Sequence, residues 1–310
     1  MKTHIAKLSV FTLLFISFSA FGEEILDLEE YLGPTKETIR QIRSEWHSYL
    51  TPSQLKIEEE TSFSVRMSWN SNGYSSRNCR TNENRKITIT AGQMFMLNML
   101  SENQMWLLAG QSEQCFTAYL DHVSDVFSQN SKAVAYNNQL TPMFTPMLFA
   151  HRYHGTCKQF SQLPMPQSQW SSLQESFIKA SLRMLLSHEL GHQVNNHGCK
   201  KLTNSESREQ EAKADSFAVN LIIKQDPADI LGAFALFTFW SVDGAMTSSD
   251  EFGNTHPAGL RRLRSALDAV SHELNKGKSS KFYNYLIKND KLVYFKELVD
   301  MLHKKTEALD

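Results

Sequence analysis

His188, Glu189 and His192 form a His-Glu-x-x-His motif inside a long stretch of helical periodicity. Residues four apart lie one turn above each other on the same face of a helix, so the two imidazoles can reach one zinc ion. Glu189 lies beside them, close enough to take a proton from water without being a metal ligand. The motif therefore predicts metal-assisted hydrolysis, provided that the chain supplies a third ligand.

Glu211 is the candidate for this third ligand, because catalytic zinc usually has three protein ligands and a water molecule. It follows His192 by nineteen residues, in the next predicted helix. Ala214 and Ala218 lie on the same helix face, and such small side chains permit the close helix contact that brings the carboxylate to the metal. Asp215, one turn from Glu211, is expected to accept the second N–H of a ligand histidine and so fix its tautomer.

His197, Glu211 and Asp215 each have an alternative role. His197 could instead be the third ligand. A different site type, the metzincin, takes its third histidine at the position that is 198 here and requires glycine at 195. The chain has Asn195 and Gly198 there, so His197 is assigned to the helix end or to a contact with a ligand. Glu211 could be a solvated helix charge and Asp215 a structural ion-pair partner, but the alanine-rich face favours metal binding.

These motifs resemble the glutamate-ligand zinc peptidases (gluzincins), in particular the group that contains the CaaX prenyl proteases, the heat-shock protease HtpX and their periplasmic relatives. The resemblance is specific over about 180–263. Four features carry it: the His-Glu-x-x-His motif followed by His197, the sequence Glu211-x-x-Ala214-Asp215, the sequence Thr255-His256-Pro257 with Arg262 five residues beyond the proline, and a strand at 86–90 that runs into a helix.

The resemblance implies one zinc ion per chain, bound by His188, His192 and Glu211. Zinc would polarise the scissile carbonyl, and Glu189 would take a proton from water and return it to the leaving amine. His256 or Arg262 would stabilise the oxyanion, and the residues alone do not choose between them. In some relatives the histidine of the His-Pro motif instead caps the zinc and gates activity. The strand at about 86–90 would be the edge strand that holds an extended substrate.

Two functions follow from this site. The first is a zinc-dependent endopeptidase of the cell envelope, with protein or peptide substrates that include envelope or outer-membrane proteins. The alternative is a latent or non-proteolytic binding or chaperone-like scaffold with a retained zinc site. An intact Glu189 favours the enzyme, because a scaffold needs no general base.

The first 22 residues have the pattern of a signal peptide. Lys2 and Lys7 precede an apolar run at 8–18, and Ala20-Phe21-Gly22 places small residues at the cleavage site. Cleavage is expected before Glu23, with a periplasmic or secreted destination and no transmembrane anchor afterwards. Residues 23–310 contain 30 basic and 33 acidic residues. This nearly balanced charge does not favour binding to nucleic acid or to anionic lipid.

Four cysteines follow the predicted signal peptide: Cys79, Cys115, Cys157 and Cys199. An even number in an oxidising compartment favours two disulfides. Three pairings are possible, and the one that joins neighbours in sequence, Cys79–Cys115 with Cys157–Cys199, is weakly preferred.

The hydrophobic pattern predicts a mainly helical (α+β) fold with the motif on an active-site helix and a small sheet edging the cleft. A single zincin-like domain is expected over 23–310, with a zinc-binding core at about 170–265 and a partly ordered insertion at about 130–168. The polar segment from Asn70 to Asn84 is predicted to be a loop. Strands are predicted at 61–69 and 86–90, and helices within 23–50 and at about 93–109, 112–128, 168–198, 206–224, 226–240, 257–275 and 280–305.

Overall fold

The computed structural model describes residues 31–69, 74–81, 83–153, 157–159, 162–199, 202–243, 259–288 and 292–309. The predicted signal peptide and His256 lie outside these residues. The chain divides into two compact units, each drawn from separate stretches: Met1–Arg40, Val65–Asn72 and Ile89–Ser176 contribute to the first, and Gln41–Ser64, Gly73–Thr88 and Phe177–Asp310 to the second. The single domain over 23–310 stays a prediction.

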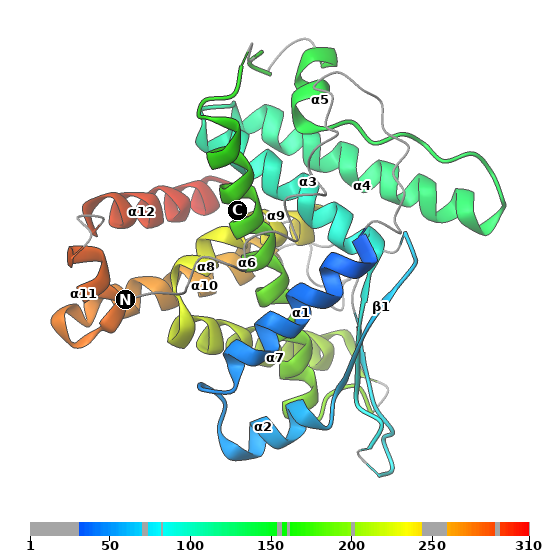
Figure 1. Ribbon diagram of the computed structural model, residues 1–310, viewed down its shortest axis with the longest axis vertical. Helices are drawn as coiled ribbons and strands as arrows, with labels where there is room; N and C mark the ends of the chain where they lie inside the picture. The colour runs from blue at the N-terminus through cyan, green and yellow to red at the C-terminus, as the bar shows by residue number, and fades with distance from the viewer. Residues whose placement is uncertain are drawn as a thin grey trace, which may run out of the picture. The chain divides into compact units, whose positions relative to one another are not determined.

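The described residues are mainly helical, with one three-stranded sheet, which confirms the α+β prediction (Figure 1). None of the described helices is long and apolar enough to cross a membrane. The strands are β1 (Ser62–Arg66), β2 (Tyr74–Ser76) and β3 (Lys86–Thr90). The helices are α1 (Leu32–Trp46), α2 (Pro52–Glu59), α3 (Ala91–Leu108), α4 (Glu113–Ala135), α5 (Pro146–Arg152), α6 (Gln167–Val194), α7 (Asn204–Gln225), α8 (Ala228–Gly232), α9 (Phe234–Asp243), α10 (Gly259–Asn275), α11 (Lys281–Lys288) and α12 (Leu292–Leu309), with a 3-10 turn at Gly277–Ser279.

The sheet has the strand order β1-β3-β2, so the strand at 86–90 is central. The prediction that it is the edge strand is therefore wrong. The two edges of the sheet are β1 and β2, and β2 pairs antiparallel with β3 and places Ser76 opposite Lys86. This strand lies inside the segment predicted to be a loop.

The first unit is built around α3, which is buried on nearly all sides. Thr90 caps its first turn by accepting a hydrogen bond from the Gln93 N–H, at 2.9 Å. Trp69, Phe95 and Phe127 pack together with ring centres 5.6–6.1 Å apart. Figure 1 shows α3 and α4 side by side, and the two helices are in contact.

The predicted insertion at 130–168 is more regular than expected, because α4 continues to Ala135 and Thr145 caps a further helix, α5. Within the first unit, Gln111 accepts a hydrogen bond from the Lys158 N–H and donates one to its carbonyl. These bonds hold the segment after α5 beside the start of α4, where Cys115 and Cys157 form a disulfide.

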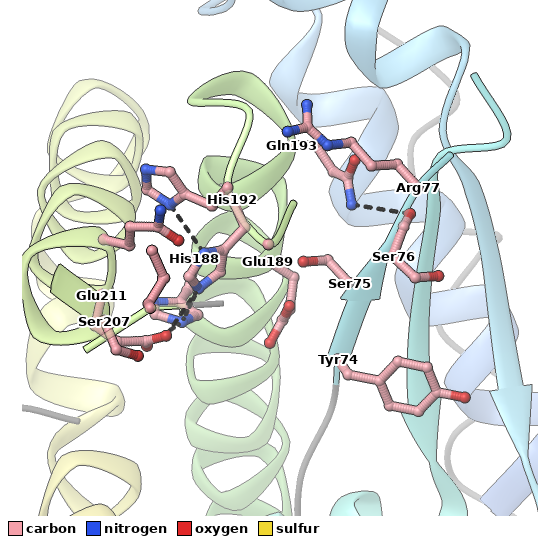
Figure 2. Close-up of a pocket in the computed structure, with 14 residues that line it drawn as sticks. Tyr74, Ser75, Ser76, Arg77, His188, Glu189, His192, Gln193, Ser207 and Glu211 are labelled. Carbon is pink, nitrogen blue, oxygen red and sulfur yellow. Dashed lines mark hydrogen bonds and ion pairs between the residues drawn. The ribbon is translucent and has the colours of Figure 1, made fainter. Parts of the chain in front are cut away.

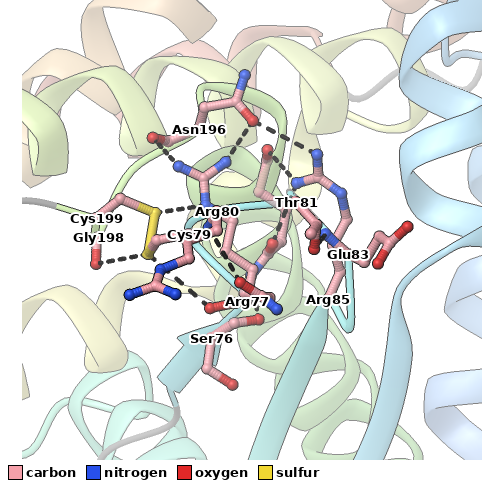
Figure 3. Close-up of a disulfide and its surroundings, with 12 residues drawn as sticks. Ser76, Arg77, Cys79, Arg80, Thr81, Glu83, Arg85, Asn196, Gly198 and Cys199 are labelled. Atoms are coloured by element: carbon pink, nitrogen blue, oxygen red, sulfur yellow. Dashed lines mark hydrogen bonds between the residues drawn. A yellow bond between two sulfur atoms is a disulfide. The ribbon is translucent and has the colours of Figure 1, made fainter.

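The disulfide in the second unit joins Cys79 to Cys199 (Figure 3). The weakly preferred pairing of sequence neighbours is therefore wrong in both bonds. The physical reason is that β2 and the end of α6 are adjacent in space, although 120 residues separate the two cysteines.

The predicted active-site helix, α6, ends at Val194, four residues before the predicted stop at Gly198. Asn196 takes the left-handed conformation that terminates a helix, with φ of 57°. Helix α7 then begins with a capping box, in which Thr203 and Glu206 satisfy each other's backbone N–H groups. The chain thereby reverses and brings α7 back against α6.

The rest of the second unit packs around α10, which contacts α7, α9 and α12. Two predicted helices are each divided in the structure. The stretch 226–240 forms α8 and α9, and the tail over 280–305 forms α11 and α12. These divisions change no residue of the predicted site.

Candidate metal centre

Three side chains converge at the contact of α6 with α7. The Nε2 atoms of His188 and His192 lie 3.1 Å apart. The Glu211 carboxylate faces both, with Oε2 3.2 Å from His188 Nε2 and Oε1 3.4 Å from His192 Nε2. Tetrahedral coordination with bonds of about 2.0–2.2 Å separates ligand atoms by about 3.3–3.6 Å. The observed spacing is close to this, so the group could hold a metal ion.

A close contact between helices places Glu211 at the histidines. Gly191 of α6 packs so tightly on α7 that an added Cβ would lie 2.9 Å from the carbonyl oxygen of Ala214 and 3.0 Å from its Cα. Ala214 is itself fully buried. The glycine inside the His-Glu-x-x-His motif and the alanine three residues after Glu211 are therefore the residues that let the helices approach.

Asp215 orients His188 from the side opposite to Glu211. Its Oδ1 lies 2.8 Å from His188 Nδ1, which leaves Nε2 directed at the candidate metal position. Burial alone would lower the pKa of His188, but hydrogen bonds to Asp215 and Glu211 raise it to about 10. Carboxylates that stabilise a proton on this imidazole would also stabilise a bound cation.

Arg262, from α10, holds Asp215 in turn. Its Nε and Nη2 donate to the two carboxylate oxygens of Asp215 at 2.6 and 2.7 Å. Burial alone would raise the pKa of Asp215, but the Arg262 guanidinium and His188 lower it, so the carboxylate stays ionised. The guanidinium also lies 3.9 Å from the centre of the Trp240 ring, which supports it as a cation–π partner.

His197 contacts the second ligand histidine. Its Nδ1 lies 3.0 Å from Nδ1 of His192. Burial and the neighbouring His192 lower the pKa of His197 to about 4, so this ring is neutral and can accept a hydrogen bond. This agrees with the assignment of His197 to a contact with a ligand and places it outside the His188–His192–Glu211 group.

A cleft of about 320 Å³ opens over the group that could hold a metal ion. It is lined by residues 74–77 on the side of β2, and by residues of α6, the α6–α7 connection and α7 on the other side. Glu189 lies in this cleft beside the two histidines (Figure 2). It has only 7 % of its surface exposed, so its carboxylate lies in a largely dehydrated setting.

The structure thus brings together most residues predicted for the site. His188, His192, Glu211 and Asp215 lie as expected from helical spacing, and Arg262 is part of the cluster. His256 lies outside the described residues. The sequence did not indicate that Ser75 and Gln193 line the cleft. No local pattern marks them, because a serine-rich polar segment and a glutamine beside the motif are ordinary features.

Comparison with known proteins adds one finding. A sequence model of the family Peptidase U49 matches residues 149–284, less than half of the chain. The matched stretch contains Glu189, the group that could hold a metal ion, and Arg262. The match supports a peptidase, and hence a protein or peptide substrate. No curated protein and no solved structure matched the chain.

Proposed function

We propose that this chain is a zinc-dependent endopeptidase of the gluzincin type. The observation that carries the proposal is the convergence of His188, His192 and Glu211, with Glu189 in the same cleft. Two imidazoles and one carboxylate are the donor set of known catalytic zinc sites with an open position. The match to a peptidase family over this stretch supports the same class.

A zinc ion bound by His188, His192 and Glu211 would act as a Lewis acid on the scissile carbonyl and would activate water. Glu189 is the general base: it takes a proton from water during attack and returns it to the leaving amine. Its low exposure strengthens its interaction with any charge that develops in the cleft.

His256 and Arg262 were alternative candidates for stabilising the oxyanion. The two bonds from Arg262 to Asp215 favour a positioning role for the arginine, through Asp215 and His188. The guanidinium holds the Asp215 carboxylate, and this carboxylate keeps the tautomer of His188 fixed. His256 stays the predicted oxyanion donor.

We also propose that the enzyme works in the periplasm or outside the cell. The signal-peptide pattern of residues 1–22 and the two disulfides support an oxidising compartment. Envelope or outer-membrane proteins are accordingly the proposed substrates.

Cleavage of casein and of an unfolded outer-membrane protein tests this proposal. Glu189→Gln should bind zinc as well as the wild type and cleave at least about 100-fold more slowly, the usual loss for a general base. Glu209→Gln is the matched control, because Glu209 is an exposed residue of α7 that pairs with Lys213. This control should cleave like the wild type.

Two results would contradict the proposal. Equal cleavage by wild type and Glu189→Gln would exclude Glu189 as the base. Zinc binding without cleavage by any of the three proteins would favour the alternative, a binding scaffold with a retained metal site.

A further inference from the structure

Gln193 connects the edge strand β2 to the active-site helix. Its side-chain Nε2 donates a hydrogen bond to the Ser76 carbonyl at 3.2 Å (Figure 2). Its Oε1 accepts one from Arg85 Nη1 at 3.4 Å, and its main-chain carbonyl accepts from the same nitrogen at 3.0 Å. Gln193 is only 2 % exposed, so the loss of either side-chain bond would leave a buried polar group unsatisfied.

This connection lies next to the chemistry. Gln193 follows Glu189 by one helical turn, so both side chains lie on the same face of α6. Ser75, the residue before Ser76, projects its side chain across the cleft toward Glu189 (Figure 2). The bond from Gln193 to Ser76 therefore links this wall of the cleft to the helix that carries Glu189.

Arg77 and the disulfide Cys79–Cys199 anchor the segment that follows β2. The Arg77 guanidinium donates to the main-chain and side-chain oxygens of Asn196, and its Nε lies 3.0 Å from Cys199 Sγ (Figure 3). These contacts lie beyond the last residue of the strand. They restrain the segment that follows β2, whereas Gln193 bonds to the strand itself, which also pairs with β3.

We propose that Gln193 is a positioning residue for peptide cleavage, which holds the Ser76 carbonyl and so sets the distance between β2 and Glu189. The inference rests on the proposed peptidase function. Glutamine suits this task because its amide donates and accepts at once, whereas a carboxylate only accepts. A displacement of about 1 Å can cost about 100-fold in rate. A small shift of β2 should therefore impair cleavage without disturbing the metal.

Two substitutions separate the bonds of this amide. Gln193→Glu keeps the acceptor for Arg85 and removes the donor to Ser76, whereas Gln193→Leu removes both. Gln174→Glu is the matched control, because Gln174 is also buried in α6 and donates to the Asn98 side chain at 2.8 Å. Both Gln193 variants should keep wild-type zinc content and lose about 10–100-fold in kcat/KM on a peptide substrate. Gln174→Glu should keep its kcat/KM, although it unfolds at a lower temperature.

Hydrogen exchange over residues 74–77 provides a readout that needs no activity. Exchange should accelerate in both Gln193 variants and stay slow in the wild type and in Gln174→Glu. Wild-type kinetics in Gln193→Glu, or unchanged exchange in both variants, would overturn the inference. A wild type that cleaves nothing would instead refute the proposed function, and the exchange rates would still decide whether Gln193 positions β2.

Discussion

Gly191→Ala is the substitution that tests most sharply how the helices build the site. The added Cβ would lie 2.9 Å from the Ala214 carbonyl oxygen, whereas ordinary contacts begin at 3.4 Å. The two nearest atoms, the carbonyl oxygen and the Cα of Ala214, belong to the backbone of α7, so this helix must move away by about 0.5 Å. Metal sites tolerate ligand displacements of only about 0.2 Å. Glu211, three residues before Ala214, would be withdrawn from His188 and His192.

The expected result is a zinc Kd raised about 10–100-fold, which corresponds to about 1.4–2.8 kcal/mol of binding free energy. The metal-free protein should also unfold more easily, because overpacking costs about 1–3 kcal/mol. Competition with a zinc chelator measures the first quantity, and urea unfolding measures the second.

Gly33→Ala is the control for the change of residue type. Gly33 lies in α1, and no atom approaches an added Cβ within 4 Å. This variant should bind zinc like the wild type and gain at most about 1 kcal/mol from its better helix propensity. Wild-type zinc affinity and stability in Gly191→Ala would refute the reasoning, because they would show that α6 and α7 do not need this close contact.

Three further predictions concern other parts of the molecule. Asp215→Asn should weaken zinc binding about 10–100-fold in chelator competition, and should destabilise the fold by about 3–5 kcal/mol because it leaves the buried Arg262 uncompensated; unchanged affinity would exclude the role of Asp215 at His188. Burial raises the pKa of Glu102 from 4.5 to about 7, so the stability it contributes is complete below pH 4.5 and is lost as the pH rises through 7. As the pH rises from 4.5 to 8, the unfolding free energy of Glu102→Gln, measured with urea, should therefore increase by about 1–3 kcal/mol relative to that of the wild type. A difference between the two proteins that does not change with pH would contradict the raised pKa of Glu102. Replacing Cys79 and Cys199 together by serine opens the larger disulfide loop, of 120 residues, and should lower the unfolding free energy by up to about 5 kcal/mol. Peptide mapping of the wild type without reductant should recover the Cys79–Cys199 link, and a Cys79–Cys115 link would contradict the fold.

Much of the candidate site could be predicted from sequence because its determinants are local. The four-residue step from His188 to His192 fixes their common helix face, whatever the rest of the fold does. The four-residue spacing of Glu211 and Asp215 likewise places both carboxylates on one face of α7. The reversal between the two helices was also indicated, since a polar connection with Gly198 leads into the second helical pattern.

The parts that sequence missed depend on contacts between distant segments. Strand β2 has only three residues, Tyr74–Ser76, too few to show an alternating pattern, and its pairing with β3 defines it. The disulfides follow from which segments meet in space, so proximity in sequence was a poor guide. The bond from Gln193 to Ser76 spans 117 positions, and no residue type at either end announces it.

The metal content of the purified protein tests the central claim most directly. Inductively coupled plasma mass spectrometry should find one zinc ion per chain in the wild type, and close to none in Glu211→Ala or in His188→Ala, while Glu209→Gln retains it. Absence of a transition metal from the folded wild type, or equal zinc content in Glu211→Ala, would contradict the claim that His188, His192 and Glu211 bind one catalytic ion.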